Sequence, residues 1–440
     1  MAPIACLFQE FPFMPLCALP ARLCRKILAL AILSSVSGIT AGYAADAEDD
    51  EAWPIGTPVV QEITGSIFLE GRYFPNPPRW DGGVRNSGSI AIEPEYYVEW
   101  EDYTSLTVTP FLRVDSADSN RTHADLREAY FRTVGDDWEL GIGLSKVFWG
   151  VTESAHLVDI INQTDVIENI DLEDKLGQPM VNLTLIRDWG YVDFFYMPYF
   201  RERTFQSRAG RLRSALVVDE KQTRYTSGAK RWHPDFAIRY SNSFGDWDVG
   251  LYHFYGTSRE ATLSLGFDPE LQPVLIPEYE LINQTGTDVQ YTTGAWLWKL
   301  EALFRQGQRN RVGEEDNYYA LAGGFEYTLY GLFDSNADLG LLAEYLRDGR
   351  QNNATGAFQN DVFLGGRLAL NDAQDTSLLF GVIEDLTYRT RLLSLEASRR
   401  LGDSFTIGIE ARFFTNVDRR DTLDGVRDDD LIQIQLGYYF

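Results

Sequence analysis

Seven carboxylates are concentrated between residues 149 and 178, against a single lysine, Lys175. They are Glu153, Asp159, Asp165, Glu168, Asp171, Glu173 and Asp174. Acidic groups at this density can attract cations, and they can orient dipolar solutes when basic groups face them. The stretch 160–165 could open a short helix with Thr164 as its cap. The alternative is that these side chains are simply solvated, so the surroundings of the segment decide its chemistry.

Basic side chains that could face this acidic segment occur on stretches where apolar and polar residues alternate. The candidates are Arg113, Arg132, Arg239, Arg305, Arg367 and Arg412. Each lies in the polar phase of its alternation, so it shares a strand face with other polar residues. Acidic and basic groups opposed across a constriction would set the selectivity for ions.

Catalytic and metal-binding patterns are weak in this chain. Neither Gly-x-Ser-x-Gly nor His-Glu-x-x-His occurs, and no Asp-x-Asp-x-Asp-Gly loop is present. The chain has four histidines, and its three cysteines all precede residue 25. We therefore expect no enzymatic activity, no cofactor and no metal site.

The elements that must position the charged groups are strands. From Gln61 to the C-terminus, runs of roughly 10 to 14 residues alternate with period two. We count about 18 such runs, with 16 possible. In one run the apolar row is Trp296, Trp298, Leu300, Ala302 and Phe304, and the opposite row carries Lys299, Glu301 and Arg305. A charged side chain facing lipid in mid-strand would cost about 2–4 kcal/mol, so the charged rows must face a lumen.

The last residues of the chain, Asp430 to Phe440, form another alternating run and end on an aromatic residue. This run resembles the closing strand of bacterial outer-membrane β-barrels, in which a terminal Phe is the usual assembly signal. Residues 61–440 as a whole resemble a large porin-like barrel. A weaker local match is Gly143 to Gly150 followed by Asp159 to Asp165, which is similar to a Trp-Gly and Asn-Pro-x-Asp pattern of porin-like families. Gln163 replaces the proline of that pattern.

The N-terminal residues predict export from the cytoplasm. Basic residues precede the apolar run from Ile27, and small residues follow it, so residues 1–44 are predicted to be a signal peptide cut after Ala44. Residues 45–60 are acidic and are predicted to be a periplasmic lead-in. A net charge of −26 argues against binding to nucleic acid, whose phosphates it would repel.

These observations predict an all-β, transmembrane antiparallel barrel with long outer loops and short periplasmic turns. The resemblance implies an outer-membrane location and passive diffusion of small solutes through a charged lumen, with 149–178 as the constriction loop. The implied partners are lipid, lipopolysaccharide and, through Phe440, the barrel-assembly machinery. Two alternatives stay open, a barrel hydrolase and a non-conducting structural or adhesin barrel. The sequence leaves the oligomeric state open.

Overall fold

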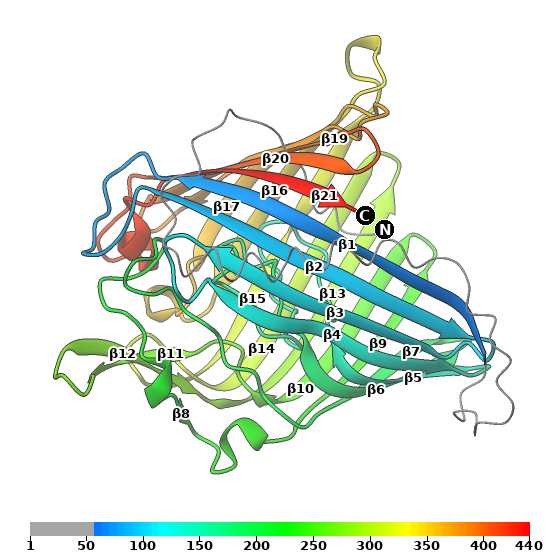
Figure 1. Cartoon of the computed structure of the whole chain (residues 1–440), viewed down its shortest axis with the longest axis horizontal. Coiled ribbons are helices and arrows are strands. Elements are labelled where there is room, and N and C mark those ends of the chain that lie inside the picture. The colour runs from blue at the N-terminus through cyan, green and yellow to red at the C-terminus, as the bar shows by residue number, and fades with distance from the viewer. Residues whose placement is uncertain (1–56) are drawn as a thin grey trace, which may run out of the picture. The chain divides into compact units, whose positions relative to one another are not determined.

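The computed structural model describes residues 57–440, which form a closed antiparallel barrel (Figure 1). In order around the barrel, its 18 strands are β1 (Pro58–Tyr73), β2 (Asn86–Trp100), β3 (Ser105–Asp115), β4 (His123–Val134), β5 (Trp138–Ser145), β6 (Gln178–Arg187), β7 (Gly190–Met197), β9 (Asp235–Phe244), β10 (Trp247–Thr257), β13 (Leu281–Thr293), β14 (Trp296–Arg309), β15 (Glu315–Leu329), β16 (Asp338–Asp348), β17 (Asn360–Ala369), β18 (Ser377–Asp385), β19 (Arg391–Leu401), β20 (Phe405–Thr415) and β21 (Leu431–Tyr439). The predicted all-β barrel and its strand count of 18 are confirmed.

The barrel closes between its first and last strands. Ser66 to Tyr73 of β1 pair with Tyr439 to Ile432 of β21, and the Phe440 amide donates to the Gly65 carbonyl at 3.1 Å. Closure pairs every strand on both sides, so the sheet has no free edge. β1 starts at Pro58, inside the range predicted as a lead-in. The predicted signal peptide and the first part of that lead-in lie outside the described residues.

The two faces of the wall differ in chemistry as the alternation predicts. On β14, the side chain of Trp298 points outward and is 45% exposed, whereas Glu301 on the inner face is fully buried at 0%. The same holds on β20, where Phe413 is exposed and Arg412 is buried. An apolar outer face and a polar inner face are the arrangement of a barrel that sits in lipid.

The connections are short at one end of the barrel, which we call the turn rim, and mostly longer at the other, the loop rim. Turns at the turn rim include 135–137, 188–189 and 245–246, and the longest is 330–337. Loops at the loop rim include 146–177, 198–234 and 258–280. The connection 386–390 is short although it lies at the loop rim.

The loops at the loop rim carry a small sheet that the alternation did not predict. It joins β11 (Thr262–Phe267) and β12 (Pro273–Tyr279) as a hairpin, and β8 (Arg224–Tyr225) pairs with β12 in parallel. Short 3-10 turns are η2 (Glu220–Gln222), η3 (Lys230–Trp232), η4 (Leu332–Asp334), η5 (Gln351–Asn353) and η6 (Thr422–Val426). Across residues 57–440 no helix is long and apolar enough to cross a bilayer.

Candidate functional site

Residues 146–177, which we call the inner loop, connect β5 to β6 and lie inside the barrel. Val158, Ile161, Asn162 and Asp165 are each at most 1% exposed, although a loop at a barrel rim would normally be solvated. The predicted short helix at 160–165 does not form, and Thr164 instead makes an isolated bridge with Lys175. The inner loop covers nearly all of the predicted segment 149–178.

Apolar packing fixes the first half of the inner loop to one side of the wall. Trp149, Val158, Ile160 and Ile161 form a cluster with inward side chains of β6 to β13. Those wall residues are Met180, Phe195, Met197, Ala237, Tyr252, Phe254 and Ile282. Burying each large apolar side chain contributes about 1.5–3 kcal/mol, so this part of the loop is held firmly.

Two carboxylates of the wall bind the backbone of the inner loop from strands beyond this cluster. Glu301 on β14 accepts hydrogen bonds from the amides of Val151 (2.7 Å), Thr152 (3.0 Å) and Val158 (3.2 Å). It also accepts one from the Thr152 hydroxyl at 2.8 Å. The backbone approaches so closely because residue 150 is glycine. A Cβ at Gly150 would lie 2.9 Å from Glu301 Oε1.

Glu344 on β16 binds the next backbone amides of the inner loop in the same way. It accepts hydrogen bonds from the amides of Glu153 at 2.9 Å and Ser154 at 2.8 Å. A hydrogen bond to a charged acceptor is worth about 1.5–3 kcal/mol, and these acceptors are buried. The two glutamates therefore act as anchors for residues 151–158.

His156 lies between two carboxylates of this region. Its Nε2 is 2.8 Å from Glu173, and its Nδ1 is 4.0 Å from Glu301. Burial disfavours the charged imidazole, but the hydrogen bond to Glu173 and the negative charges of Glu173 and Glu301 outweigh it and raise the pKa of His156 to about 10. His156 is therefore a cation at neutral pH, a role that the sequence did not suggest.

Five of the seven predicted acidic residues are paired with an arginine or a lysine. Asp165 contacts Arg127 at 2.6 Å, and Glu168 contacts Arg113 at 2.6 Å. The other pairs are Glu153 with Arg367, Asp159 with Lys175 at 2.9 Å, and Asp171 with Arg412 at 3.4 Å. The pairs of Glu168, Asp165 and Asp171 hold the second half of the loop against β3, β4 and β20.

The six predicted arginines fall into two groups. Arg113, Arg367 and Arg412 contact acidic residues of the inner loop, and Arg239 lies 4.9 Å from the Trp149 ring while it pairs with Asp288. The others do not reach the loop. Arg305 pairs with Glu260 of the 258–280 loop at 3.0 Å, and Arg132 pairs with Glu139 near the turn rim at 2.6 Å.

Arg127 is the basic residue of the site that alternation missed, and a bulge explains why. The register between β3 and β4 shifts between Thr109 and Pro110, whose partners are Glu128 and Leu126. Arg127 is the extra residue at that shift, so it points inward in phase with His123 before the shift but out of phase with Arg132 after it, and it is 4% exposed. After a bulge the alternation of inward and outward residues resumes in the opposite phase, so the sequence pattern does not reveal which residue is the extra one.

Two acidic residues of the inner loop remain open to solvent. Glu173 has a side chain that is 52% exposed, and its partner is His156. Asp174 is exposed and has no ion pair within the described residues. Leu172 is exposed beside them, and Lys146 and Phe148 are exposed at the start of the loop.

Solved structures similar to this chain include an outer membrane protein and a porin. OmpT, an outer membrane protein of Vibrio cholerae, is 11% identical, with a TM-score of 0.46, over 87% of this chain and 99% of that one. A triple mutant of the Rhodopseudomonas blastica porin is 12% identical, with a TM-score of 0.42, over 87% and 100%. No protein-family model and no curated protein sequence matches the chain. At these identities the likeness concerns only the fold, which the strand pairing already establishes.

Proposed function

We propose that the protein is a channel of the bacterial outer membrane, through which small hydrated solutes diffuse and in which the inner loop narrows the path. The inner loop carries this proposal. A barrel of this strand number is too wide for wall side chains to fill, and here a loop enters it and binds β4 and β16, which lie halfway around the ring from each other. A loop that crosses the lumen reduces the cross-section of the lumen and leaves the barrel wall unchanged.

The exposed carboxylates of the inner loop favour cations over anions. Glu153, Asp159, Asp165, Glu168 and Asp171 are neutralised by their basic partners. Glu173 and Asp174 keep exposed carboxylates, and Glu173 faces a cation, His156. Desolvation and the nearby charges of Glu168 and Asp165 raise the pKa of Asp174 to about 7, so its negative charge is complete only above neutral pH. Exposed carboxylates beside a narrowed path attract cations and repel anions.

Single-channel recording of the refolded protein in a planar bilayer tests this proposal. Under a salt gradient we expect stable open steps and a reversal potential of the sign that cation preference gives. Replacing Glu173 with Gln and Asp174 with Asn together should move the reversal potential toward anions, because the exposed negative charge is removed. Asp403→Asn, in the exposed turn 402–404 of the turn rim, is the control and should leave the potential near its starting value.

Silence from a folded barrel would refute the channel and favour a structural or adhesin role. If the barrel conducts but the double substitution does not change its reversal potential, the channel proposal stands and the selectivity assigned to Glu173 and Asp174 is refuted.

An outer-membrane hydrolase is the enzymatic alternative. Among residues 57–440, one histidine ring is hydrogen-bonded to a hydroxyl, His253 to Thr285 at 2.8 Å. His253 is exposed and lies on β10 in the outward row between Leu251 and Tyr255, whose side chains are also exposed. A nucleophile and base there would face lipid and not a water-filled site, which supports a channel over an enzyme. Hydrolysis of ester or peptide substrates by the purified barrel would reverse this assignment.

The outer face supports placement in a membrane with lipid and lipopolysaccharide as its surroundings. Trp296 and Trp298 stack at 5.5 Å near the turn rim, and Tyr327 packs against Trp296 at 4.5 Å. Aromatic groups of this kind gather where a barrel crosses the membrane interface. We also assign the C-terminal Phe440 as the contact with the assembly machinery.

A further inference from the structure

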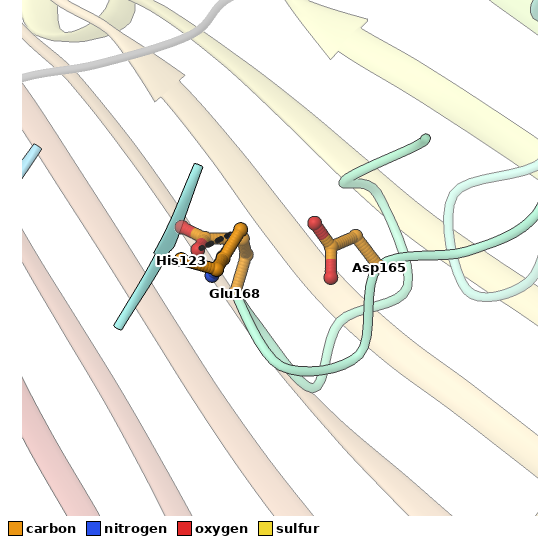
Figure 2. Close-up of side chains that lie close together, drawn as sticks. All are labelled: His123, Asp165 and Glu168. Carbon is orange, nitrogen blue, oxygen red and sulfur yellow. Dashed lines mark ion pairs between the residues drawn. The ribbon is translucent and has the colours of Figure 1, made fainter. Parts of the chain in front are cut away.

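His123, Asp165 and Glu168 form a cluster where the inner loop meets the wall (Figure 2). His123 is the first residue of β4, and the two carboxylates come from the inner loop. One possible ligand atom from each residue lies within 4.8 Å of those of the other two. Figure 2 shows His123 and Glu168 side by side, with the carboxylate of Asp165 directed toward them.

The histidine offers a lone pair to this cluster. Its Nδ1 lies 3.3 Å from the carbonyl oxygen of Arg121, and a carbonyl can only accept, so Nδ1 carries the hydrogen. In the neutral ring, Nε2 then has a free lone pair. That Nε2 lies 3.7 Å from Glu168 Oε1. A backbone carbonyl that fixes the tautomer in this way is the usual support of a metal-binding histidine.

The facing carboxylate oxygen is buried and lacks a donor. Glu168 is 5% exposed, and within the described part of the chain its Oε1 has no hydrogen-bond partner. Its other oxygen, Oε2, is 2.6 Å from Arg113. With a neutral ring, two acceptor atoms face each other across a short gap, an arrangement that either a proton on Nε2 or a metal ion between them would satisfy.

Arginines orient both carboxylates without using all of their oxygens. Arg127 contacts Asp165 Oδ2 at 2.6 Å, as Arg113 contacts Glu168 Oε2. Each carboxylate keeps a second oxygen for the cluster. Hydrogen-bonded groups outside the ligands commonly hold ligating side chains in place, and here the two arginines would do so.

We propose that His123, Asp165 and Glu168 bind a divalent transition-metal ion of the zinc type. One imidazole and two carboxylates suit Zn²⁺, whereas Ca²⁺ and Mg²⁺ prefer oxygen ligands alone and more of them. Water would complete the coordination. The sequence predicted no metal site, because a wall residue and two loop residues more than forty positions away form no spacing motif.

Such an ion would connect the inner loop to β4. The wall supplies one ligand and the loop supplies two, so binding favours the docked position of the loop over any released position. This inference rests on the local geometry and does not require that the barrel conducts.

Binding is tested on the full refolded protein in detergent after treatment with a chelator. Titration calorimetry with Zn²⁺, together with the metal content after dialysis, should give one ion per chain. His123→Ala removes a ligand, so it should weaken binding by more than the 10-fold to 100-fold that loss of an outer partner of a ligand costs, or abolish it. The control is His233→Ala, since His233 also lies near a carboxylate, Asp235, at 3.1 Å, and its loss should leave binding unchanged.

Should His123→Ala not fold, His123→Gln is titrated in its place, because an amide can still donate to the Arg121 carbonyl. No saturable binding by the folded protein would overturn the proposal. Binding that survives the His123 change, or that falls equally with His233→Ala, would also overturn it and indicate adventitious surface binding. Neither the calorimetric titration nor the metal content depends on conductance. Failure of the metal-site proposal can therefore be told apart from failure of the channel proposal.

Discussion

Glu301 shows how a single buried carboxylate can position a loop. It collects donors from Val151, Thr152 and Val158 on one side of the lumen. Alternation places Glu301 on the inner face of its strand but cannot show that its partners lie about 150 residues earlier. The sequence therefore predicted the lumenal charges, and it could not predict which of them bind backbone and which line water.

Glu301→Gln should loosen the inner loop while the barrel stays folded. The amide keeps the size of the side chain but removes the charge that the three backbone donors share. Hydrogen exchange should become faster for residues 151–158. Glu326→Gln is the control, because in the described structure Glu326 faces Lys299 and Arg367 and receives no backbone amide from the loop. Equal effects of the two changes would argue against anchoring by Glu301.

His156 gives the docking of the loop a pH dependence. Its pKa is raised from the ordinary 6.5 to about 10, so protonation stabilises the folded state. This stabilisation is fully present below pH 6.5 and is lost as the pH rises through 10. We expect protection of residues 151–158 from hydrogen exchange, corrected for the intrinsic rate, to fall across this window. In His156→Gln the fall should be absent, and its persistence would point to another group.

At the scale of elements, the strands were the predictable part. Period-two alternation located all 18, since each strand has one lipid-facing side and one lumenal side. The hairpin of β11 and β12 was missed because it lies within a connection outside the barrel wall and has no lipid-facing side to impose the pattern. The arginine displaced by the bulge in β4 was missed for a related reason, since a bulge interrupts the period.

Gly150→Ala tests the close approach of the inner loop to β14. Gly150 has a φ of +135°, and an added Cβ would lie 2.9 Å from Glu301 Oε1 and 3.0 Å from His156 Nδ1. We expect a loss of about 1–3 kcal/mol in loop docking from backbone strain and this crowding. Hydrogen exchange of residues 146–177 measures it.

Gly313→Ala is the matched control for that change. Gly313 also has a positive φ of +86°, but nothing lies within 4 Å of its added Cβ. Gly313→Ala introduces backbone strain but no close contact, so the inner loop should stay protected from hydrogen exchange. Faster exchange of the inner loop in both variants would refute the role of the close approach.

For the whole molecule, closure depends on the pairing of β21 with β1, and Phe440 ends that seam. Its amide and carbonyl both bond to Gly65 at 3.1 Å, which any residue at this position could do. The aromatic side chain is 47% exposed, and it stacks on the Tyr438 ring with 6.1 Å between the centroids. The contact with the assembly machinery proposed above would use this exposed ring.

Phe440→Ala should therefore reduce assembly in cells by a large factor and leave refolding in detergent almost unchanged. The measurements are the amount of folded barrel in outer membranes and the yield of refolded protein. Phe333→Ala, at an exposed position of the turn rim, controls for the loss of an aromatic side chain. Equal losses in cells and in detergent would mean that Phe440 matters for stability alone.

The inner loop also has a mechanical consequence for the barrel. A ring held only by its strand ladder can flatten, because small changes of angle at many hydrogen bonds add up to an ellipse. Here Asp165 is tied to Arg127 on β4, and Glu153 is tied to Glu344 on β16, halfway around the ring. The loop thus acts as a strut across the diameter and resists flattening under lateral pressure from the membrane. The width of the lumen is then set by the protein itself and stays nearly constant when the surrounding lipid changes.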